Sequence, residues 1–385
     1  MFHSADQNEI KEGQITDAYF PRTLEVLKAA GIDKRVKAEF IVKGLPCNWP
    51  WGILAGVEEC AELLKGLRVS VRSMKEGTVF KSYQPVMEIE GNYREFGKYE
   101  TSLLGFLCQA SGVATKAARC KKAAGTRMVI SFGGRRVHPA VAPVVERSSF
   151  IGGFDGVSIL KSGEIIGERA MGTMPHALII IMGDTVEATR AFHKVLGSKV
   201  RTISLIDTFH DEKFEALRVA ESLGDKLYGV RLDTPVSRRG DFLRILEEVR
   251  WELDLRGYNR VKLFVSGGLD EDDIGKLNPL VDGYGLGTSV SNARVIDFAM
   301  DIVEVEGKPI AKRGKSSGSK KVLRCTTCCS DKVIPVFEKL TRCECGGKYD
   351  DLLHHLIDKG KLKEKLPSPQ KIREYVLKEL EKYPL

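Results

Sequence analysis

A chain of 385 residues, 43% of them hydrophobic, is long enough to form two or three globular domains. Sixty Lys and Arg against 52 Asp and Glu give a net charge of +8, which suits an anionic ligand but is too dispersed to indicate nucleic-acid binding by itself. No apolar run approaches the roughly 20 residues that cross a bilayer, and the polar start MFHSADQNEIKEG lacks a signal-peptide core, so we expect a cytoplasmic protein.

The first part of the chain mixes strand-like and helix-like segments. RVKAEFIV and GTVFKSYQPVMEIEG have the apolar and β-branched content of strands, whereas GILAGVEECAELLKGL has helical periodicity. We therefore expect an α+β layer over residues 1–110, completed by residues 291–311.

From about residue 125 onward, short apolar strands alternate with helices. The expected strands are RMVISF, GVSIL, ALIIIM, VRTISLI, LYGVRLD, VKLFVSGG and VDGYGLG. Alternation of this kind indicates right-handed parallel crossovers. Seven strands fit an irregular α/β barrel over residues 111–290, and an open doubly wound sheet is the alternative.

Polar residues and glycines gather after these strands, at their carboxyl ends. They are Gly133–Arg136, Ser158–Lys161, Asp207, Thr208, Arg231, Asp233, Ser266–Gly268 and Gly285–Thr288. Parallel α/β folds bind ligands outside the carboxyl ends of their strands, so this rim predicts an active site.

Two glycine-rich turns, VSGGLD and GYGLGTSVSN, follow the last two expected strands. Glycines allow backbone N–H groups to approach a phosphate closely, and they predict a phosphate site at Gly267, Gly268, Gly287 and Thr288. Plain tight turns are the alternative.

Two aspartates and an arginine on the same rim suggest the rest of a sugar phosphate site. Asp207 and Asp233 are placed to hold ribose hydroxyls or Mg²⁺, and Arg231 to grip a phosphate. Helix capping for the aspartates and a surface ion pair for the arginine are the alternatives. Sugar, Mg²⁺ and phosphate together favour phosphoribosyl pyrophosphate as substrate.

These motifs bring a family into view, because the chain resembles the nicotinate phosphoribosyltransferases, in particular their short archaeal type. The resemblance spans about residues 13–295 and rests on motifs that occur in the family's order: ITDAYF, YETSLLGFLCQASGVATKA, SFGGRR, GGFDGVSILKS, GTMPH, LIDT, VRLD, VSGGLD and GYGLGTSVSN. It implies the type II phosphoribosyltransferase fold, an N-terminal α/β sandwich joined to an irregular α/β barrel. It also implies that nicotinate and phosphoribosyl pyrophosphate give nicotinate mononucleotide and pyrophosphate, in NAD salvage. Many members couple this reaction to ATP hydrolysis, the form classed as a ligase.

The resemblance also assigns residues that hold the base. Phe132 and Tyr19 match the aromatic pair that sandwiches the pyridine ring, with the tyrosine from a neighbouring subunit, so a homodimer with shared sites is implied, possibly within a higher oligomer. Flat rings suit a heteroaromatic base, although Phe132 taken alone would be assigned to the core. Arg135 or Arg136 would meet the substrate carboxylate, and Thr173 would line the pocket.

Two further positions concern ATP and specificity. His176 matches the histidine that members using ATP phosphorylate; from the residues alone it is a histidine that opens a buried strand, with a structural role as the alternative. Ser158 stands where relatives that use nicotinamide carry an aspartate. A carboxylate there would repel nicotinate, so the serine favours the acid.

The end of the chain predicts a separate metal-binding domain. KRGKSSGSKK, residues 312–321, contains no strongly apolar residue and suggests a linker before a domain at 322–385. Five of the nine cysteines crowd there, and a C-x₂-C pair followed by a C-x-C pair predicts structural Zn²⁺ on Cys325, Cys328, Cys343 and Cys345. Ser368 and Pro369 predict the start of a final amphipathic helix.

Two other functions compete with this interpretation. A zinc-ribbon protein that binds nucleic acid would explain the cysteines and the basic linker, but aromatic residues for base stacking are sparse there. Quinolinate phosphoribosyltransferase has the same fold, and it would need a more basic pocket for two carboxylates and a route to decarboxylation.

Overall fold

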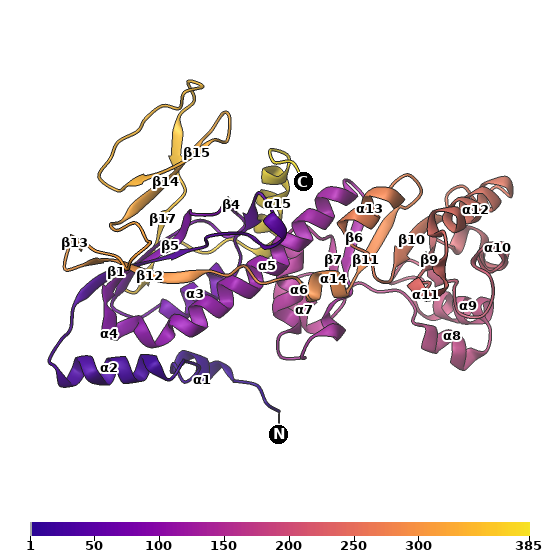
Figure 1. Ribbon diagram of the computed structural model, residues 1–385. Coiled ribbons are helices and arrows are strands. Elements are labelled where there is room, and N and C mark those ends of the chain that lie inside the picture. Colours follow the sequence, from indigo (N-terminus) through magenta and orange to yellow (C-terminus); the bar gives the residue numbers. More distant parts are fainter. Residues whose placement is uncertain (1) are drawn as a thin grey trace. The chain divides into compact units, whose positions relative to one another are not determined.

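The computed structural model describes residues 2–385, which form two compact units (Figure 1). The first unit, here called the sandwich unit, contains the residues up to Thr115 together with Arg294–Pro384. The second, the barrel unit, contains Lys116–Ala293. Among the described residues, no helix is long and apolar enough to cross a membrane.

The sandwich unit is built on a seven-stranded antiparallel sheet whose strands come from both ends of the chain. In spatial order the strands are β13 (Lys308–Pro309), β12 (Ala299–Val305), β1 (Arg35–Ile41), β5 (Pro85–Asn92), β3 (Val69–Ser73), β17 (His354–Asp358) and β18 (Lys361–Leu362). A small second sheet joins β2 (Gly52–Ile53) and β4 (Val79–Phe80). The helices are α1 (Gln7–Lys11), α2 (Tyr19–Ala29), α3 (Val57–Leu64), α4 (Tyr93–Phe96), α5 (Glu100–Ala124), which runs on into the barrel unit, and α15 (Pro369–Leu380).

Side chains alternate between the two faces of this sheet, because successive residues of a strand point to opposite sides. In β1, Ala38 and Phe40 are fully buried in a hydrophobic core that also contains Leu64 of α3 and Leu103 of α5. Lys37 and Glu39, which alternate with them in β1 and point to the other face, carry charges. The expected α+β layer is therefore present.

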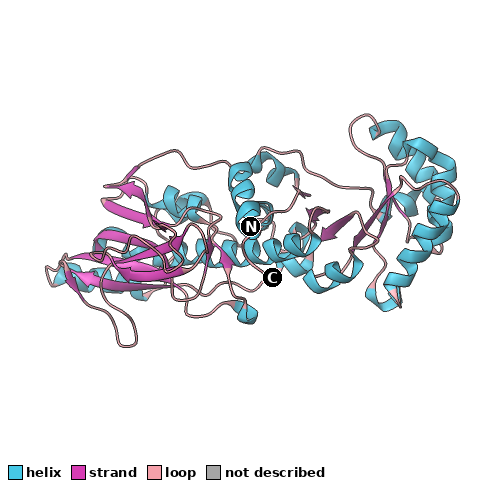
Figure 2. Ribbon diagram, turned by 90° about the horizontal axis from the view of Figure 1, so that it is seen from above, coloured by secondary structure: helices cyan, strands magenta, loops and turns pink. Residues whose placement is uncertain are grey.

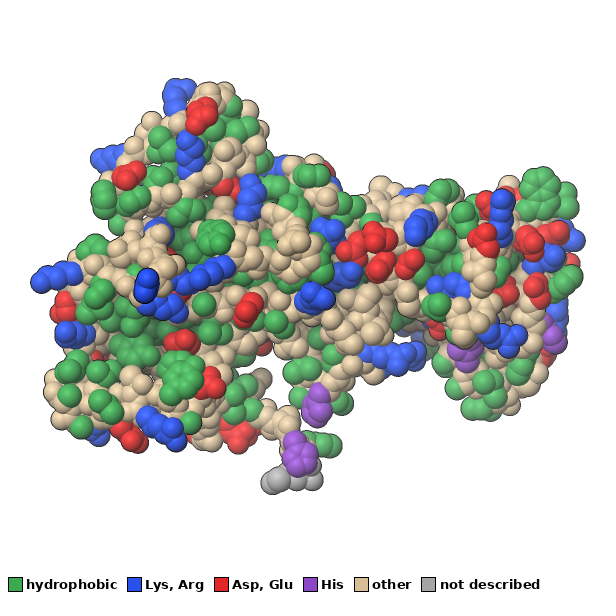
Figure 3. Space-filling view, viewed as in Figure 1, with side chains coloured by type: hydrophobic (Ala, Val, Ile, Leu, Met, Phe, Trp, Pro, Cys, Tyr) green, Lys and Arg blue, Asp and Glu red, His purple; other side chains and the backbone are tan. Residues whose placement is uncertain are grey.

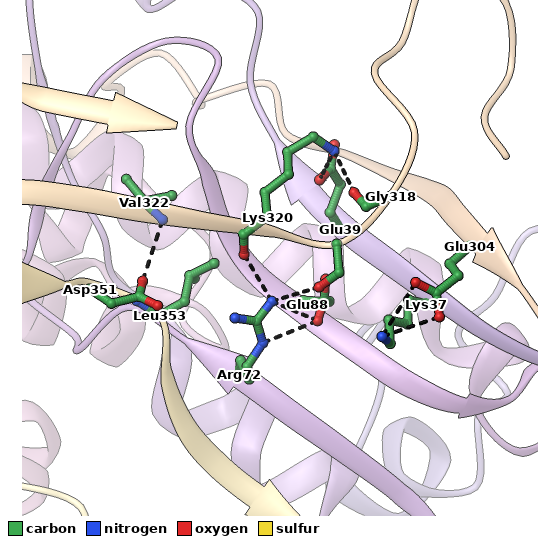
Figure 4. Close-up of polar contacts among 11 residues, drawn as sticks. Lys37, Glu39, Arg72, Glu88, Glu304, Gly318, Lys320, Val322, Asp351 and Leu353 are labelled. Carbon is green, nitrogen blue, oxygen red and sulfur yellow. Dashed lines mark hydrogen bonds and ion pairs between the residues drawn. The ribbon is translucent and has the colours of Figure 1, made fainter. Parts of the chain in front are cut away.

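The charged face is covered by the start of β14 (Lys320–Cys325) and the residues just before it, as Figure 4 shows. The ammonium of Lys320 lies 2.8 Å from a carboxylate oxygen of Glu39. Ser319 donates to Glu88 at 2.6 Å. Arg72 binds the same Glu88 at 2.9 Å and also donates to the backbone carbonyl of Lys320. Charges that are buried in pairs and also hydrogen-bonded avoid much of the cost of an isolated buried charge.

This packing differs from the linker expected at residues 312–321. Ser319 and Lys320 are buried, and Lys312 and Lys315 both form ion pairs with Asp301. The segment lacks strongly apolar side chains, but its ammonium and hydroxyl groups satisfy carboxylates on the sheet.

Residues 322–385 also differ from the separate domain that was expected, since β17 and β18 extend the large sheet. A three-stranded sheet of β15 (Asp331–Pro335), β14 and β16 (Tyr349–Asp351) holds the cysteines, within the same unit. The final helix is as predicted: Ser368 caps α15 and Pro369 is its first residue.

The barrel unit contains a six-stranded, fully parallel sheet. In spatial order its strands are β7 (Gly156–Val157), β6 (Met128–Ser131), β11 (Gly283–Leu286), β10 (Lys262–Ser266), β9 (Gly229–Leu232) and β8 (Ile203–Leu205). This is the chain order of a barrel, with the last strand returning to the first. Among the described residues β7 and β8 do not pair, so the barrel is irregular and opens between them. The doubly wound alternative is excluded, because that topology reverses strand order in mid-sheet.

One expected strand of the barrel is a helix. ALIIIM lies in α8 (His176–Met182), which follows β7 in the chain and precedes β8. Pro175 precedes the helix, and Gly183 ends it with a φ of 81°, a left-handed conformation that suits glycine. Ile179 packs into a small core with Met174 and Leu205. The β-branched residues favour a strand, but tertiary packing and the residues at the two ends of the segment make it a helix.

The other helices of the barrel unit follow the strands in sequence, and Figure 2 shows them flanking the strands. They are α6 (Ala142–Ile151), α7 (Leu160–Ile166), α9 (Thr185–Leu196), α10 (Glu212–Leu223), α11 (Val236–Arg239), α12 (Phe242–Leu255), α13 (Glu271–Leu277) and α14 (Thr288–Ser291).

Candidate active site

A cavity of about 570 Å³ lies in the barrel unit, where the strands end. Residues that follow five of the six parallel strands line it, together with the loop that leads into α8. The lining comprises Phe132, Arg135, Arg136, Ser158, Ile159, Gly172–His176, Arg231, Asp233, Pro235, Val236, Ser266–Gly268, Gly285, Gly287 and Thr288. The rim expected from the sequence is thus one continuous site.

Most of the residues proposed from the sequence meet at this cavity. The exceptions are Asp207, which is buried behind it, and Tyr19, which belongs to α2 of the sandwich unit. The Tyr19 side chain is 58% exposed. A tyrosine that is exposed on its own unit is available to a neighbouring chain.

Phe132 lies at the end of β6 and forms one wall of the cavity. Its ring fits against Gly285 of β11, where an added Cβ would stand only 2.2 Å from the ring. The guanidinium of Arg231 lies over the same ring, 5.6 Å from its centroid. Burial lowers the pKa of Arg231, which nearby Asp233 and Asp207 oppose and Arg135 reinforces.

Arg135 and Arg136 form the last two residues of a short 3₁₀ turn, Gly134–Arg136. Both side chains are exposed and both line the cavity. With Arg231 they place three guanidinium groups on one site, which gives it a strong preference for anions. His138, to which no role is assigned, is exposed nearby and accepts a hydrogen bond from the Ala140 N–H.

Ser158 follows β7 and is tied to a buried carboxylate on α6 that the sequence did not reveal. Glu146 is 0% exposed and accepts three hydrogen bonds: from the Ser158 N–H at 3.1 Å, the Ser158 hydroxyl at 2.7 Å and the Ile159 N–H at 2.9 Å. Ser158 therefore does not keep carboxylates away from this wall, as was expected, because the Glu146 carboxylate lies directly behind it.

His176 is the first residue of α8 and lies between two carboxylates. Its Nε2 is 3.7 Å from Asp207 Oδ2 and 3.8 Å from Asp233 Oδ2. Its Nδ1 is hydrogen-bonded to the hydroxyl of Thr208 at 3.0 Å. The expected place at the start of a strand is wrong, because His176 begins a helix that brings its imidazole to the cavity. Thr173, in the loop before this helix, donates to the Met174 carbonyl at 3.4 Å.

Asp207 and Asp233 form a pair of acidic groups that suits a hard cation. The Asp207 side chain is only 2% exposed, and its Oδ1 has no hydrogen-bond partner among the described residues. Burial raises the pKa of Asp207; His176 counteracts this rise and Asp233 adds to it. Asp233 accepts a hydrogen bond from Ser266 at 2.8 Å. A buried carboxylate oxygen with an unused lone pair, beside a second carboxylate, fits Mg²⁺ or ribose hydroxyls.

The two glycine turns follow β10 and β11, and both contribute residues to the cavity lining. Gly267 and Gly268 have φ values of 88° and 65°, which only glycine adopts readily. At Gly267 an added Cβ would stand 3.0 Å from Asp233 Oδ1. Gly287 and Thr288 lead into α14, which has only four residues.

The predicted metal ligands lie in the sandwich unit and form a compact cluster. The Sγ atoms of Cys325, Cys328, Cys343 and Cys345 all lie within 4.8 Å of one another. Two of the separations are 3.4 Å, for Cys325 and Cys345, and 3.7 Å, for Cys328 and Cys343. Four thiolates about 2.3 Å from zinc in a tetrahedron would be about 3.8 Å apart, so the cluster fits structural Zn²⁺.

Comparison with known proteins gives family models for both units. The model described as the N-terminal domain of quinolinate phosphoribosyl transferase matches residues 17–111. The model of the C-terminal domain of the same family matches residues 113–301.

Individual relatives extend this result. A nicotinate phosphoribosyltransferase of Mycobacterium tuberculosis is 29% identical over 82% of this chain and 79% of the relative. The nicotinate phosphoribosyltransferase of Bacillus subtilis is 31% identical over 72% of this chain and 63% of the relative. The crystal structure of nicotinate-nucleotide pyrophosphorylase from Pyrococcus furiosus is 53% identical, covers 100% of this chain and 99% of that chain, and has a TM-score of 0.98. The chain therefore belongs to the family of the nicotinate and quinolinate phosphoribosyltransferases.

Proposed function

We propose that the chain is a nicotinate phosphoribosyltransferase, an enzyme of NAD salvage that forms nicotinate mononucleotide and pyrophosphate from nicotinate and phosphoribosyl pyrophosphate. The observation that carries this proposal is the single cavity, which joins an aromatic wall, three guanidinium groups, a carboxylate and a glycine turn. These are the partners that a pyridine carboxylate, a ribose and a phosphate require.

The base would stack on Phe132, with its carboxylate bound by Arg135 or Arg136. Arg231, predicted from the sequence to grip a phosphate, lies against this same aromatic wall. Its charge would therefore act where the base and the leaving pyrophosphate meet. Ser158 and Thr173 would complete the wall of the base site.

The ribose would lie near Asp233 and Asp207, and Gly267, Gly268, Gly287 and Thr288 would receive phosphate. The two aspartates are the residues that would hold Mg²⁺, which when bound neutralises charge on the pyrophosphate leaving group. The family uses no protein nucleophile for the transfer itself. Breaking the anomeric C–O bond builds positive charge on ribose, so fixed carboxylates and a well-placed pyridine nitrogen provide the catalysis.

His176 would accept a phosphoryl group from ATP, which makes the protein a transient phosphoprotein and the coupled reaction that of a ligase. Thr208 fixes the ring through Nδ1, and this leaves Nε2 as the nucleophilic nitrogen. Asp207 and Asp233 would stabilise a positive imidazole as the phosphoryl group is transferred.

A homodimer would complete each site with Tyr19 from a second copy. The barrel unit offers an apolar surface for such contact: hydrophobic side chains gather over α8 (Figure 3), where Ile180 is 59% and Ile181 82% exposed. A patch of this kind on a protein surface commonly marks an interface. The substrates are metabolites of the cytoplasm, which we expect to be its compartment.

The test is a pyrophosphate-release assay with phosphoribosyl pyrophosphate and, in parallel, nicotinate, nicotinamide or quinolinate, with and without ATP. We expect turnover with nicotinate, and slower turnover without ATP. Turnover with quinolinate and release of carbon dioxide, without turnover of nicotinate, would instead identify a quinolinate phosphoribosyltransferase, the activity for which the matching domain models are named.

A further inference from the structure

Arg239, at the end of α11, is a buried cation that the proposed reaction does not yet use. The residue is 9% exposed and does not belong to the lining of the cavity, although it contacts residues that do. Among the described residues it forms no ion pair, and the charges of Asp273 and Asp233 act on it only from a distance. Burying a guanidinium costs free energy unless its N–H groups are hydrogen-bonded, so the groups that accept these bonds indicate its role.

Those partners are backbone carbonyls of two active-site loops. Nε donates to Thr234 at 3.0 Å, in the loop after β9. Nη2 donates to Ser266 at 3.3 Å and to Gly267 at 2.5 Å, in the turn after β10. The guanidinium carbon also lies over the Phe242 ring, 4.3 Å from its centre, in a cation–π contact. Arg239 thus joins the loop of Asp233 to the glycine turn.

The hydrogen bonds to the Ser266 and Gly267 carbonyls determine where the N–H groups of the following residues point. In a trans peptide the N–H points away from the C=O, and the described residues contain no cis bond. Since the Ser266 and Gly267 carbonyls are held by Arg239, the N–H groups of Gly267 and Gly268 point away from it. Both glycines line the cavity, and neither N–H has an acceptor among the described residues.

We propose that Arg239 is a positioning residue that builds the phosphate site, by holding two backbone N–H groups toward the cavity and placing a positive charge behind them. The ligand class is a phosphate monoester, and under the proposed function, on which this inference rests, it is the 5-phosphate of phosphoribosyl pyrophosphate. Two preorganised N–H donors with a buried cation behind them bind an anion without rearrangement. Glycine is favoured at position 267 as well, because its φ is 88° and an added Cβ would lie 3.0 Å from Asp233 Oδ1 and 3.2 Å from Arg239 Nη2.

The first experiment measures binding of ribose 5-phosphate to the full chain by calorimetry. We compare wild type, Arg239→Met, Arg239→Lys and the neighbouring Arg238→Met, which removes an exposed guanidinium from the same helix. We expect at least a 10-fold weaker Kd for Arg239→Met, because the two N–H groups lose the contact that holds them and the charge behind them is removed. Arg239→Lys, which keeps the charge but not the fork, should be intermediate, and Arg238→Met should match wild type.

The second experiment separates positioning from general damage. For folded Arg239→Met, the KM for phosphoribosyl pyrophosphate should rise at least 10-fold and that for nicotinate less than 3-fold. In wild type labelled with ¹⁵N-glycine, ribose 5-phosphate should shift the amide signals of Gly267 and Gly268, a readout that needs no variant to fold.

Unchanged amide signals, or wild-type affinity in Arg239→Met, would overturn the inference even if the enzyme converts nicotinate. Conversely, a chain that binds ribose 5-phosphate through Arg239 but converts no pyridine carboxylate would retain the phosphate site and refute the proposed function.

Discussion

The hydroxyl of Ser158 donates its hydrogen to Glu146, so that a serine of the cavity wall is held 2.7 Å from a fully buried carboxylate oxygen. The same carboxylate accepts the N–H groups of Ser158 and Ile159. A charge taken out of water is tolerated here because three donors surround it. Glu146 therefore holds Ser158 and Ile159, which form part of the cavity wall, in place.

Glu146→Gln should destabilise the protein by about 1–3 kcal/mol, since an amide nitrogen cannot accept the hydrogen bonds that a carboxylate oxygen accepts. Ser158→Ala, which removes one of the three bonds, should cost about 0.5–1.5 kcal/mol. Urea unfolding of both variants measures these effects. Equal stability of Glu146→Gln and wild type would show that the carboxylate does not hold this wall.

Under the proposed function, selectivity for nicotinate over nicotinamide would then come from the arginines. Arg135→Ala or Arg136→Ala should raise the KM for nicotinate by about 10- to 100-fold, the loss of one charged hydrogen bond of about 1.5–3 kcal/mol. The KM for nicotinamide, which has no carboxylate, should change much less. Steady-state kinetics with both bases decides, with Lys194→Ala on α9 as the control because that exposed cation does not line the cavity. An equal rise for both bases would remove the arginines from carboxylate recognition.

Residues that follow a strand were predictable from the sequence, because local pattern determines them. Apolar runs that contain β-branched residues and are followed by glycine predicted β6 and β10, and the polar residues after the strands predicted the rim. The site came together because parallel strands all end at one edge.

Three features depended on contacts between distant parts of the chain and were missed. ALIIIM contains the residues of a strand, but the proline and glycine at its ends and its packing on Leu205 make it helical. From the sequence, Glu146 would be assigned to the exposed face of α6. In the folded protein the turn after β7 covers it, and Ser158 donates a hydrogen bond to it. Lys320 looked like part of a free linker, and only the fold brings Glu39 to it.

The four-cysteine cluster should hold one Zn²⁺ per chain. Cys345→Ser should release it, because a hydroxyl is a much poorer zinc ligand than a thiolate, whereas Cys329→Ser should retain it, since Cys329 lies outside the cluster. Elemental analysis of the purified proteins gives the stoichiometry. Chelation should loosen β14–β16 while nicotinate turnover in the barrel unit persists. Metal-free protein with these cysteines joined as disulfides would contradict the site.

Glu100, at the start of α5, predicts a pH dependence of stability. Burial raises its pKa to about 7 in the folded protein; Asp301 and Asp17 add to the effect, and Lys312 opposes it. Between its ordinary value of 4.5 and about 7 the folded state binds the proton more tightly than the unfolded state. The contribution of Glu100 to stability is therefore full below 4.5 and is lost as the pH rises through 7.

Glu100→Gln, which stays neutral, should gain stability relative to wild type as the pH rises from 5 to 8. Urea unfolding across this range tests the effect, with Glu25→Gln on α2 as an exposed control. A difference between Glu100→Gln and wild type that stays constant with pH would show that Glu100 does not titrate in this window.

His176 and His193 provide a matched pair for the phosphorylation hypothesis. Each ring is hydrogen-bonded through Nδ1 to a threonine, His176 to Thr208 at 3.0 Å and His193 to Thr202 at 2.7 Å. Only His176 lines the cavity and has two carboxylates within 4 Å of Nε2. Under the proposed function, Nε2 would attack the terminal phosphate of ATP and release ADP, while the carboxylates stabilise the charge that develops on the ring.

His176→Ala should fold, retain slow transfer to nicotinate without ATP, and lose both ATP stimulation and acid-labile phosphate from labelled ATP. His193→Ala should be labelled as wild type is, because it removes a histidine of the same local bonding outside the cavity. Thr208→Val should lower the rate of labelling without abolishing it, since the ring loses its orientation but keeps its nucleophile. Phosphate incorporation by acid-sensitive labelling and steady-state rates with and without ATP measure these effects. If His176→Ala were still labelled to full stoichiometry, the phosphate would reside on another residue, and His176 would be left with the positioning of Asp207 and Asp233 as its role.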